Sequence, residues 1–208
     1  MSILKRLLCA AVLSAGALGG TFTAAHAATA WDEGVSGDLS NVGTSPTALT
    51  LLPGSNLLIG TTGRGTSGVD RDYFAFTIPS GWQLETLTLI DGVFLGGQSL
   101  SFIGVQAGPQ VTVNPTGGSA TGLLGWYHYG PNDPGTDILP LIGFGLGATG
   151  FLGPLPAGTY AFWIQDTGSG TASYRFDFGV TAVPEPAAAW LLAAGLVGLT
   201  LKRRRTGR

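Results

Sequence analysis

The acidic residues Asp70 and Asp72 are the side chains in this sequence best suited to bind a metal ion. They are separated by one residue, so on an extended strand both carboxylates lie on one side, about 7 Å apart. Ca²⁺ is bound by about six to eight oxygen ligands, and the pair would supply two carboxylates. Aspartates beside a turn more commonly accept backbone N–H bonds, and that alternative stays open. The EF-hand pattern D-x-[DN]-x-[DN]-G does not occur.

The sequence predicts no catalytic residues, and therefore a protein that is not an enzyme. His128 is the only histidine after residue 27, so no second histidine exists there for a zinc site. The nucleophile motif Gly-x-Ser-x-Gly is absent, and the only cysteine, Cys9, lies near the N-terminus. A pair of carboxylates of the glycosidase kind stays open, because such pairs depend on distance in the folded protein and not on sequence spacing.

The aromatic residues Trp126, Tyr127 and Tyr129 are the candidates for stacking against sugar rings. Flat aromatic faces pack well on the apolar faces of such rings. The competing interpretation is ordinary packing within the fold, which we prefer for Trp163 and also for residues 126–129, so the cluster is the candidate if a glycan site exists.

Two glycine motifs, at residues 63–68 and 145–150, match Gly-x-Gly-x-x-Gly. A dinucleotide site requires a strand before this motif and a helix after it. The first match runs directly into an expected strand, and Pro154 closely follows the second. Neither match therefore predicts a nucleotide cofactor.

Charge and glycine content set limits on function and fold. Residues 28–183 hold eleven acidic and three basic side chains, a net charge near −8. Such a surface repels phosphate and attracts cations, so we expect no nucleic-acid partner. Glycine accounts for 35 of the 208 residues, about twice its usual share, and it separates short apolar runs without replacing them. This segment has no cysteine, so packing must stabilise it without disulfides.

Short alternating runs between turn residues predict an all-β fold. The clearest lie at residues 57–62, 72–78, 84–90, 100–106, 160–165 and 174–180. In the last run, four residues share one face: Tyr174, Phe176, Phe178 and Val180. About seven to nine strands at this spacing predict a single antiparallel β-sandwich, jelly-roll-like, over residues 28–182.

Residues 121–154 have no clear period, because prolines and glycines interrupt them. We expect long loops around one or two strands there.

The N-terminus has the features of a secretory signal peptide. Lys5 and Arg6 precede an apolar stretch at residues 7–18, and Ala25-His26-Ala27 is a small-residue cleavage site. This order of features predicts a signal helix, removed after residue 27.

The C-terminus has a rigid break, an apolar helix and a basic end. Val183-Pro184-Glu185-Pro186 is followed by an uncharged run at residues 187–201 and a basic tail at 202–208, which begins with four charges: Lys202, Arg203, Arg204 and Arg205. The apolar run reaches about 22 Å as a helix, against about 30 Å of hydrocarbon. Trp190 at one interface and snorkelling basic side chains at the other extend it to a transmembrane helix.

This C-terminal segment resembles the PEP-CTERM sorting signal of Gram-negative bacteria that make extracellular polysaccharide. The resemblance rests on Val183-Pro184-Glu185-Pro186, the short apolar helix and the Arg-rich end. It implies recognition by an exosortase, a membrane protease-transpeptidase, and removal of the helix near Pro184–Pro186.

The body resembles the pre-peptidase C-terminal family of bacterial β-sandwich modules. The resemblance rests on residues 60–62, 70–76, 156–160 and 174–176, and residues 121–154 depart from it. It implies an accessory or binding module. Some members bind calcium through an acidic N-terminal segment and an Asp-x-Asp, which here points to four residues: Asp70 and Asp72, with Glu33 and Asp38.

Together these patterns predict a protein exported by the general secretion machinery, anchored briefly in the inner membrane, processed by an exosortase and delivered to the cell surface or outside the cell. We expect a structural or adhesive role associated with exopolysaccharide. The alternative is a calcium-assisted carbohydrate-binding module, with calcium as the one cofactor that the residues suggest.

Overall fold

The computed structural model describes residues 27–66, 68–95 and 101–183. Within them the chain forms nine strands and two short helices: β1 (Ala28–Asp32), α1 (Glu33–Ser36), β2 (Thr47–Ala48), β3 (Gly54–Gly65), β4 (Gly68–Ile78), β5 (Trp82–Val93), β6 (Ser101–Ala107), β7 (Gly125–Tyr129), α2 (Leu139–Gly143), β8 (Gly158–Asp166) and β9 (Gly170–Ala182). The predicted β-rich, mostly antiparallel fold is confirmed. The predicted helices of the signal peptide and of residues 187–201 lie outside the described residues.

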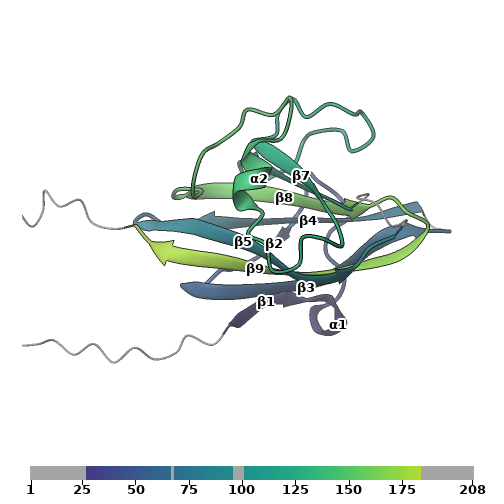
Figure 1. The fold of residues 1–208 in the computed structure, drawn as a ribbon, viewed down its shortest axis with the longest axis horizontal. Helices are drawn as coiled ribbons and strands as arrows, with labels where there is room; N and C mark the ends of the chain where they lie inside the picture. The colour runs from purple at the N-terminus through teal and green to yellow at the C-terminus, as the bar shows by residue number, and fades with distance from the viewer. Residues whose placement is uncertain (1–26, 67, 96–100, 184–208) are drawn as a thin grey trace, which may run out of the picture.

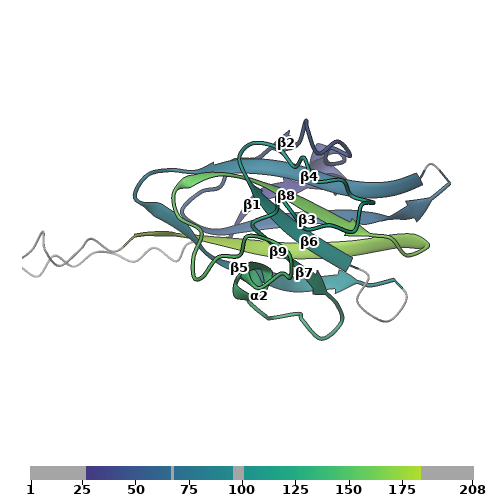
Figure 2. The same ribbon diagram turned by 90° about the horizontal axis from the view of Figure 1, so that it is seen from above.

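The strands form one curled sheet in the order β5-β9-β3-β4-β8-β6-β7, with β1 parallel to β3 and β2 parallel to β4 (Figures 1 and 2). β3 pairs with β4 only beside the hairpin that joins them, over residues 63–65 and 68–70. Beyond it the β5-β9-β3 and β4-β8-β6-β7 portions share a core. Because the hairpin joins both portions into one sheet, the predicted jelly-roll sandwich is not confirmed.

An aromatic cluster fills the core between these two portions of the sheet. The Phe178 ring of β9 meets three rings of the other portion edge-on, at centroid distances of 5.8, 5.7 and 5.6 Å from Phe74, Phe76 and Phe162. Edge-to-face pairs of this kind contribute about 0.5–1.5 kcal/mol each beyond their burial. These contacts hold the curled sheet closed around its core.

The alternation predicted for β9 is present in the structure. Tyr174, Phe176, Phe178 and Val180 are all at most 5% exposed. Asp177 faces the other way, where its Oδ1 accepts hydrogen bonds from the Ser55 hydroxyl at 2.7 Å and from a β3 backbone N–H. One face of β9 therefore forms the core while the other fixes the neighbouring strand.

Residues 121–154 form the strand β7 and a series of turns, which agrees with the expected loops around one or two strands, together with the short helix α2, which was not expected. Leu123 packs against the outer face of the sheet beside Phe102 and Trp163. Asp137 Oδ1 accepts hydrogen bonds from the backbone N–H groups of Leu87, at 2.9 Å, and Leu139, at 3.1 Å, which attaches α2 to β5. This segment thus covers part of the sheet that would otherwise face solvent.

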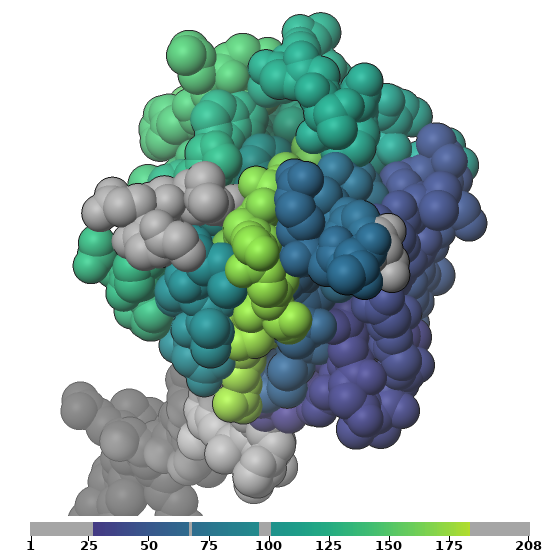
Figure 3. Space-filling view, turned by 90° about the vertical axis from the view of Figure 1, so that its right-hand side faces the viewer, coloured from purple at the N-terminus to yellow at the C-terminus, as the bar shows by residue number. Residues whose placement is uncertain are grey.

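The beginning of β1 and the end of β9 lie at the same end of the sheet, here called the proximal end (Figure 1). Ala28 pairs with Asn56 of β3, and Asn56 pairs with Phe178 of β9. The β3–β4 hairpin lies at the opposite, distal end, which Figure 3 faces: β9 runs in yellow-green between teal β5 and the blue hairpin. None of the helices within residues 27–66, 68–95 and 101–183 has the length and hydropathy to cross a membrane.

Candidate functional site

Three carboxylates from two parts of the sequence meet toward the distal end of the domain. Glu33 begins α1, Asp38 follows that helix, and Asp72 lies on β4. One oxygen from each lies within 4.8 Å of the other two. We call these three residues the acidic cluster.

Asp72 is the buried member of the acidic cluster. It shares the core-facing side of β4 with Phe74, and its side chain is 0% exposed. Its Oδ2 accepts a hydrogen bond of 2.6 Å from the Tyr174 hydroxyl, whereas its Oδ1 is buried and has no partner among the described residues. A buried carboxylate oxygen without a donor is unfavourable, so this group requires either a proton or a cation.

The environment of Asp72 strongly favours its neutral form in the absence of a cation. Burial is the largest cause and the negative charge of Glu33 the second, and together with smaller contributions from Asp70 and Asp38 they raise the pKa of Asp72 to about 9. The hydrogen bond from Tyr174 opposes this rise. The neighbouring carboxylates therefore repel a charge on Asp72 unless a positive ion lies among them.

Glu33 connects the N-terminal segment to β3. Its Oε2 accepts hydrogen bonds from the Thr61 backbone N–H at 2.7 Å and the Thr61 hydroxyl at 3.2 Å, and its Oε1 accepts one from the Leu39 N–H at 3.1 Å. Burial raises the pKa of Glu33, and these backbone bonds oppose that rise. Each oxygen has donors already, so Glu33 is held in place with capacity left for a further ligand.

Gly60 makes the close approach of these groups possible. A Cβ atom at Gly60 would lie 2.3 Å from the Tyr174 hydroxyl oxygen and 3.0 Å from the Glu33 carboxyl carbon. Only glycine leaves space for both side chains on this side of β3.

Asp70 lies beside the acidic cluster and is not one of its three members. Burial and the charge of Asp38 raise the pKa of Asp70. Asp70 and Asp38 border an open depression with Asn41, Thr62 and Arg64. Of the four residues suggested for calcium, the structure therefore joins Glu33, Asp38 and Asp72 and leaves Asp70 at the edge. A backbone hydrogen bond with Arg71 lowers the pKa of Asp70 in part, so the alternative of aspartates that accept backbone N–H bonds stays open for this residue.

The predicted aromatic cluster is divided between the two faces of the sheet. Trp126 and His128 of β7 face outward, whereas Tyr127 packs against the core, where its hydroxyl lies 3.2 Å from Asp133 Oδ1. Tyr129 is 2% exposed and packs edge-on against Phe176 at 5.2 Å. Successive side chains of a strand point to opposite faces, so Tyr127 and Tyr129 cannot form one platform with Trp126.

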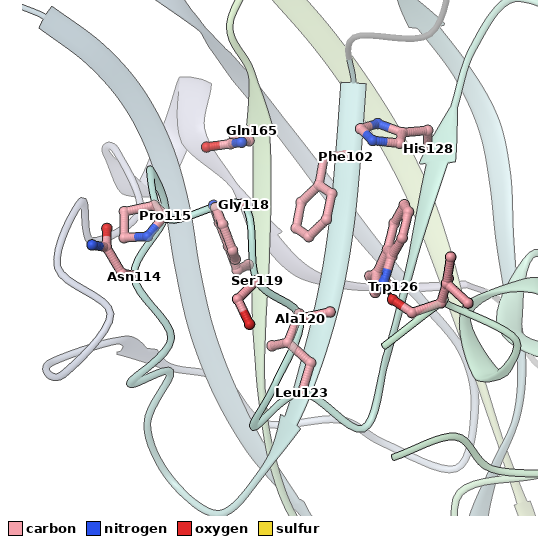
Figure 4. A pocket seen from close by; sticks show the side chains of 12 residues that line it. Phe102, Asn114, Pro115, Gly118, Ser119, Ala120, Leu123, Trp126, His128 and Gln165 are labelled. Atoms are coloured by element: carbon pink, nitrogen blue, oxygen red, sulfur yellow. Dashed lines mark hydrogen bonds between the residues drawn. The ribbon is translucent and has the colours of Figure 1, made fainter. Parts of the chain in front are cut away.

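Trp126 instead lines a pocket on the outer face of β6, β7 and β8, with a volume of about 240 Å³ (Figure 4). The other aromatic residues that line this pocket are Phe102, His128 and Trp163. The sequence prediction missed Phe102 and Gln165 because each appears as one ordinary residue in a strand. Their strand neighbours Ile103 and Ile164 belong to the core, and this alternation along each strand was the available signal.

The structure gives His128 aromatic neighbours. The centroid of its ring lies 5.2 Å from that of Trp126 and 5.7 Å from that of Phe102, and its Nδ1 is 3.3 Å from the Ser101 carbonyl oxygen.

The two glycine motifs do not have the strand-then-helix arrangement of a nucleotide-binding site. The first forms the β3–β4 hairpin, and the second lies in turns after α2.

Comparison with known families identifies one segment. Residues 182–205 match the PEP-CTERM protein-sorting motif, which begins at the last residue of β9. No curated protein and no solved structure matches the chain, so the resemblance to pre-peptidase C-terminal modules is not confirmed. The sorting motif implies an exported protein that is transiently anchored in the membrane and has an exosortase as its processing partner.

Proposed function

We propose that this chain is an exosortase-processed protein of the cell surface or extracellular matrix, with a structural or adhesive role associated with exopolysaccharide. The observation that carries this proposal is the sorting motif at residues 182–205, joined directly to the end of β9. A β domain at the outer side of such a signal is the part that remains after the membrane segment is removed.

The arrangement of the domain supports this role. Both the beginning of β1 and the end of β9 lie at the proximal end, whereas Glu33 contacts Thr61, six residues along β3 from Ser55. At about 3.3 Å per residue, this places the acidic cluster about 20 Å from the ends of the domain. A domain tethered at its proximal end would present its distal end and outer face to the surroundings.

The test is to follow the protein in its native host and in a strain that lacks the exosortase. We expect an intact mass that begins after Ala27 and ends near Pro184–Pro186, with the protein in the matrix fraction of the host. Without the exosortase, the apolar segment should remain and hold the protein in the membrane. A strain that makes no exopolysaccharide should release the processed protein into the medium.

Two results would contradict this proposal. Full-length protein in the host with an active exosortase would contradict the processing step. An unchanged distribution in the strain without exopolysaccharide would contradict the association with that polymer.

A second candidate, a calcium-assisted carbohydrate-binding module, is favoured by the buried Oδ1 of Asp72. This oxygen has no donor in the described structure, and the carboxylates of Glu33 and Asp38 lie beside Asp72. Glu33, Asp38 and Asp72 would hold the ion, which would supply the positive charge that their mutual repulsion requires.

Calcium binding predicts a thermal shift. An ion that binds only the native state stabilises it by about 1.4 kcal/mol at about ten times its dissociation constant, which raises the melting temperature by about 3–6 °C. We expect this shift when calcium chloride is added to the mature domain, and its loss in Asp72→Asn. The exposed Asp91→Asn is the matched control and should keep the shift. The absence of a shift at millimolar calcium, or an equal shift in Asp72→Asn, would rule out this candidate.

A further inference from the structure

We propose that the outer-face pocket of β6, β7 and β8 binds one neutral sugar ring of a glycan chain. This inference rests on the proposed association with exopolysaccharide, and it assigns the binding of the polysaccharide to a particular site on the domain. It places the bound ring away from Tyr127 and Tyr129, on residues that come from three strands, the loop before β7 and the turns after α2.

Strand pairing builds the floor of the pocket in two rows. Phe102 of β6 lies between His128 of β7 and Gln165 of β8, and Gly104 lies between Trp126 and Trp163. Because Gly104 has no side chain, the Phe102 ring occupies the space above it: a Cβ there would lie 3.0 Å from that ring. The floor is therefore a continuous aromatic surface.

The rings of this surface are packed against each other. Phe102 stacks on Trp126 with centroids 6.0 Å apart and an interplanar angle of 21°, and it lies 4.6 Å from Trp163. The Trp126 indole N–H donates to the Leu146 carbonyl oxygen at 3.0 Å, which fixes the orientation of that ring. Trp126 is half-buried, so it keeps ring surface for a ligand, and a rigid aromatic face loses little entropy on binding.

Two amide groups at the rim can donate hydrogen bonds to a sugar. The Gln165 Oε1 accepts from the Arg71 guanidinium at 2.9 Å, and the Asn114 Oδ1 accepts from the Thr116 N–H and hydroxyl, both at 2.9 Å. Each oxygen is thus engaged, while neither amide nitrogen has an acceptor in the described part of the chain. Figure 4 shows Gln165 between Phe102 and Pro115 at this rim.

Trp163 adds a further polar group in the same wall. Its ring is 5% exposed, and its indole N–H is buried with no acceptor among the described residues. Buried donors are normally paired, so this N–H is an unsatisfied donor in the wall of the pocket.

The charge of the pocket selects the class of sugar. Among its lining residues no Asp, Glu, Lys or Arg occurs, and the segment around it has a net charge near −8. Acidic sugars would be repelled without a compensating cation. The volume of about 240 Å³ lies below the range of about 300–1,000 Å³ for drug-sized ligands, which fits one ring.

The test measures binding of the mature domain to purified host exopolysaccharide, cellohexaose, laminarihexaose and mannohexaose, with polygalacturonate as the acidic comparison. Tryptophan fluorescence and calorimetry report the affinity. We expect binding to a neutral probe, about tenfold weaker in Trp126→Ala and partly restored in Trp126→Phe. Trp82→Ala, which changes a half-buried tryptophan at the start of β5, is the matched control and should bind normally.

A second variant tests the pocket independently, in case Trp126→Ala does not fold. Ser119 is exposed at the rim, so Ser119→Phe should obstruct the pocket without changing the core, and it should weaken binding to a similar extent. Equal binding by wild type, Trp126→Ala and Ser119→Phe would overturn the assignment, as would preferential binding of polygalacturonate or a lack of binding to every neutral probe.

The experiment separates this assignment from the proposed function. Protein that stays in the host matrix but binds no neutral probe would overturn the pocket and leave the matrix role in place. Protein that binds through the pocket but is absent from the matrix would overturn the matrix role and leave the pocket in place.

Discussion

Asp72 is the residue whose environment departs most from that of an ordinary aspartate. Its side chain is fully buried, one oxygen bonds to Tyr174, and the other has no protein partner in the described structure. Such a position is unfavourable for a lone charged carboxylate. It is compatible with a neutral acid, or with a carboxylate that shares a cation with Glu33 and Asp38.

This position predicts a dependence of stability on pH when calcium is removed by a chelator. The pKa of Asp72 is raised to about 9 in the fold, above about 3.9 in the unfolded chain. Between these values the native state holds a proton that the unfolded state has lost, so raising the pH favours unfolding. The contribution of neutral Asp72 to the free energy of unfolding should be fully present below about pH 4 and lost by about pH 9. Between these values the free energy of unfolding should fall by at most about 1.4 kcal/mol per pH unit.

Urea denaturation at several pH values checks this prediction. Asp72→Asn keeps the shape of the side chain and cannot titrate, so its stability should change less with pH than that of the wild type. Asp91→Asn, an exposed change, should follow the wild type. Identical pH profiles for wild type and Asp72→Asn would show that this carboxyl group is not responsible.

At the scale of the element, β3 supports the acidic cluster through its backbone. Thr61 donates two hydrogen bonds to Glu33, and Gly60 leaves room for the Tyr174 hydroxyl that reaches Asp72. The strand thus positions two of the three carboxylates without providing one itself.

Gly60→Ala tests this role of β3. The new Cβ would lie 2.3 Å from the Tyr174 hydroxyl oxygen, so Tyr174 must move and its bond to Asp72 is disturbed. We expect a loss of about 1–3 kcal/mol in the free energy of unfolding, measured in urea. Gly65→Ala on the same strand is the matched control, because no atom lies within 4 Å of its new Cβ. Equal stability of the two variants would contradict the proposed packing.

β7 shows how one strand serves two environments. Tyr127 and Tyr129 pack on the core side, and Trp126 and His128 form part of the pocket on the outer side. The residues are neighbours in sequence, yet the pleat of the strand separates them.

At the scale of the whole molecule, both ends of the β domain lie together and the acidic cluster lies far from them. The outer-face pocket lies on the outer side of β6, β7 and β8, whereas the buried Asp72 of the acidic cluster faces the core from β4. The two candidate sites are therefore separate, and each can be changed without altering the other. The sorting motif starts where β9 ends, so processing would leave the folded domain whole.

The sequence alone was sufficient for the sorting motif and for the six longest β strands, but not for β1 and β2. A sorting signal is read along the chain, and the alternation of Tyr174, Phe176, Phe178 and Val180 is a local consequence of strand geometry, so both are visible without a fold. The acidic residues could also be named, although their grouping rested on a resemblance that the comparisons do not confirm.

The tertiary structure decided which of these residues meet. Glu33 and Asp72 are far apart in sequence, and pairing of β1 with β3 together with curling of the sheet brings them together, while Asp70 stays at the edge. Pairing of β6 with β7 and with β8 put Gly104 between two tryptophans and created the pocket. The alternation within a strand fixes which of its faces is buried, but it does not specify which distant strand becomes its partner.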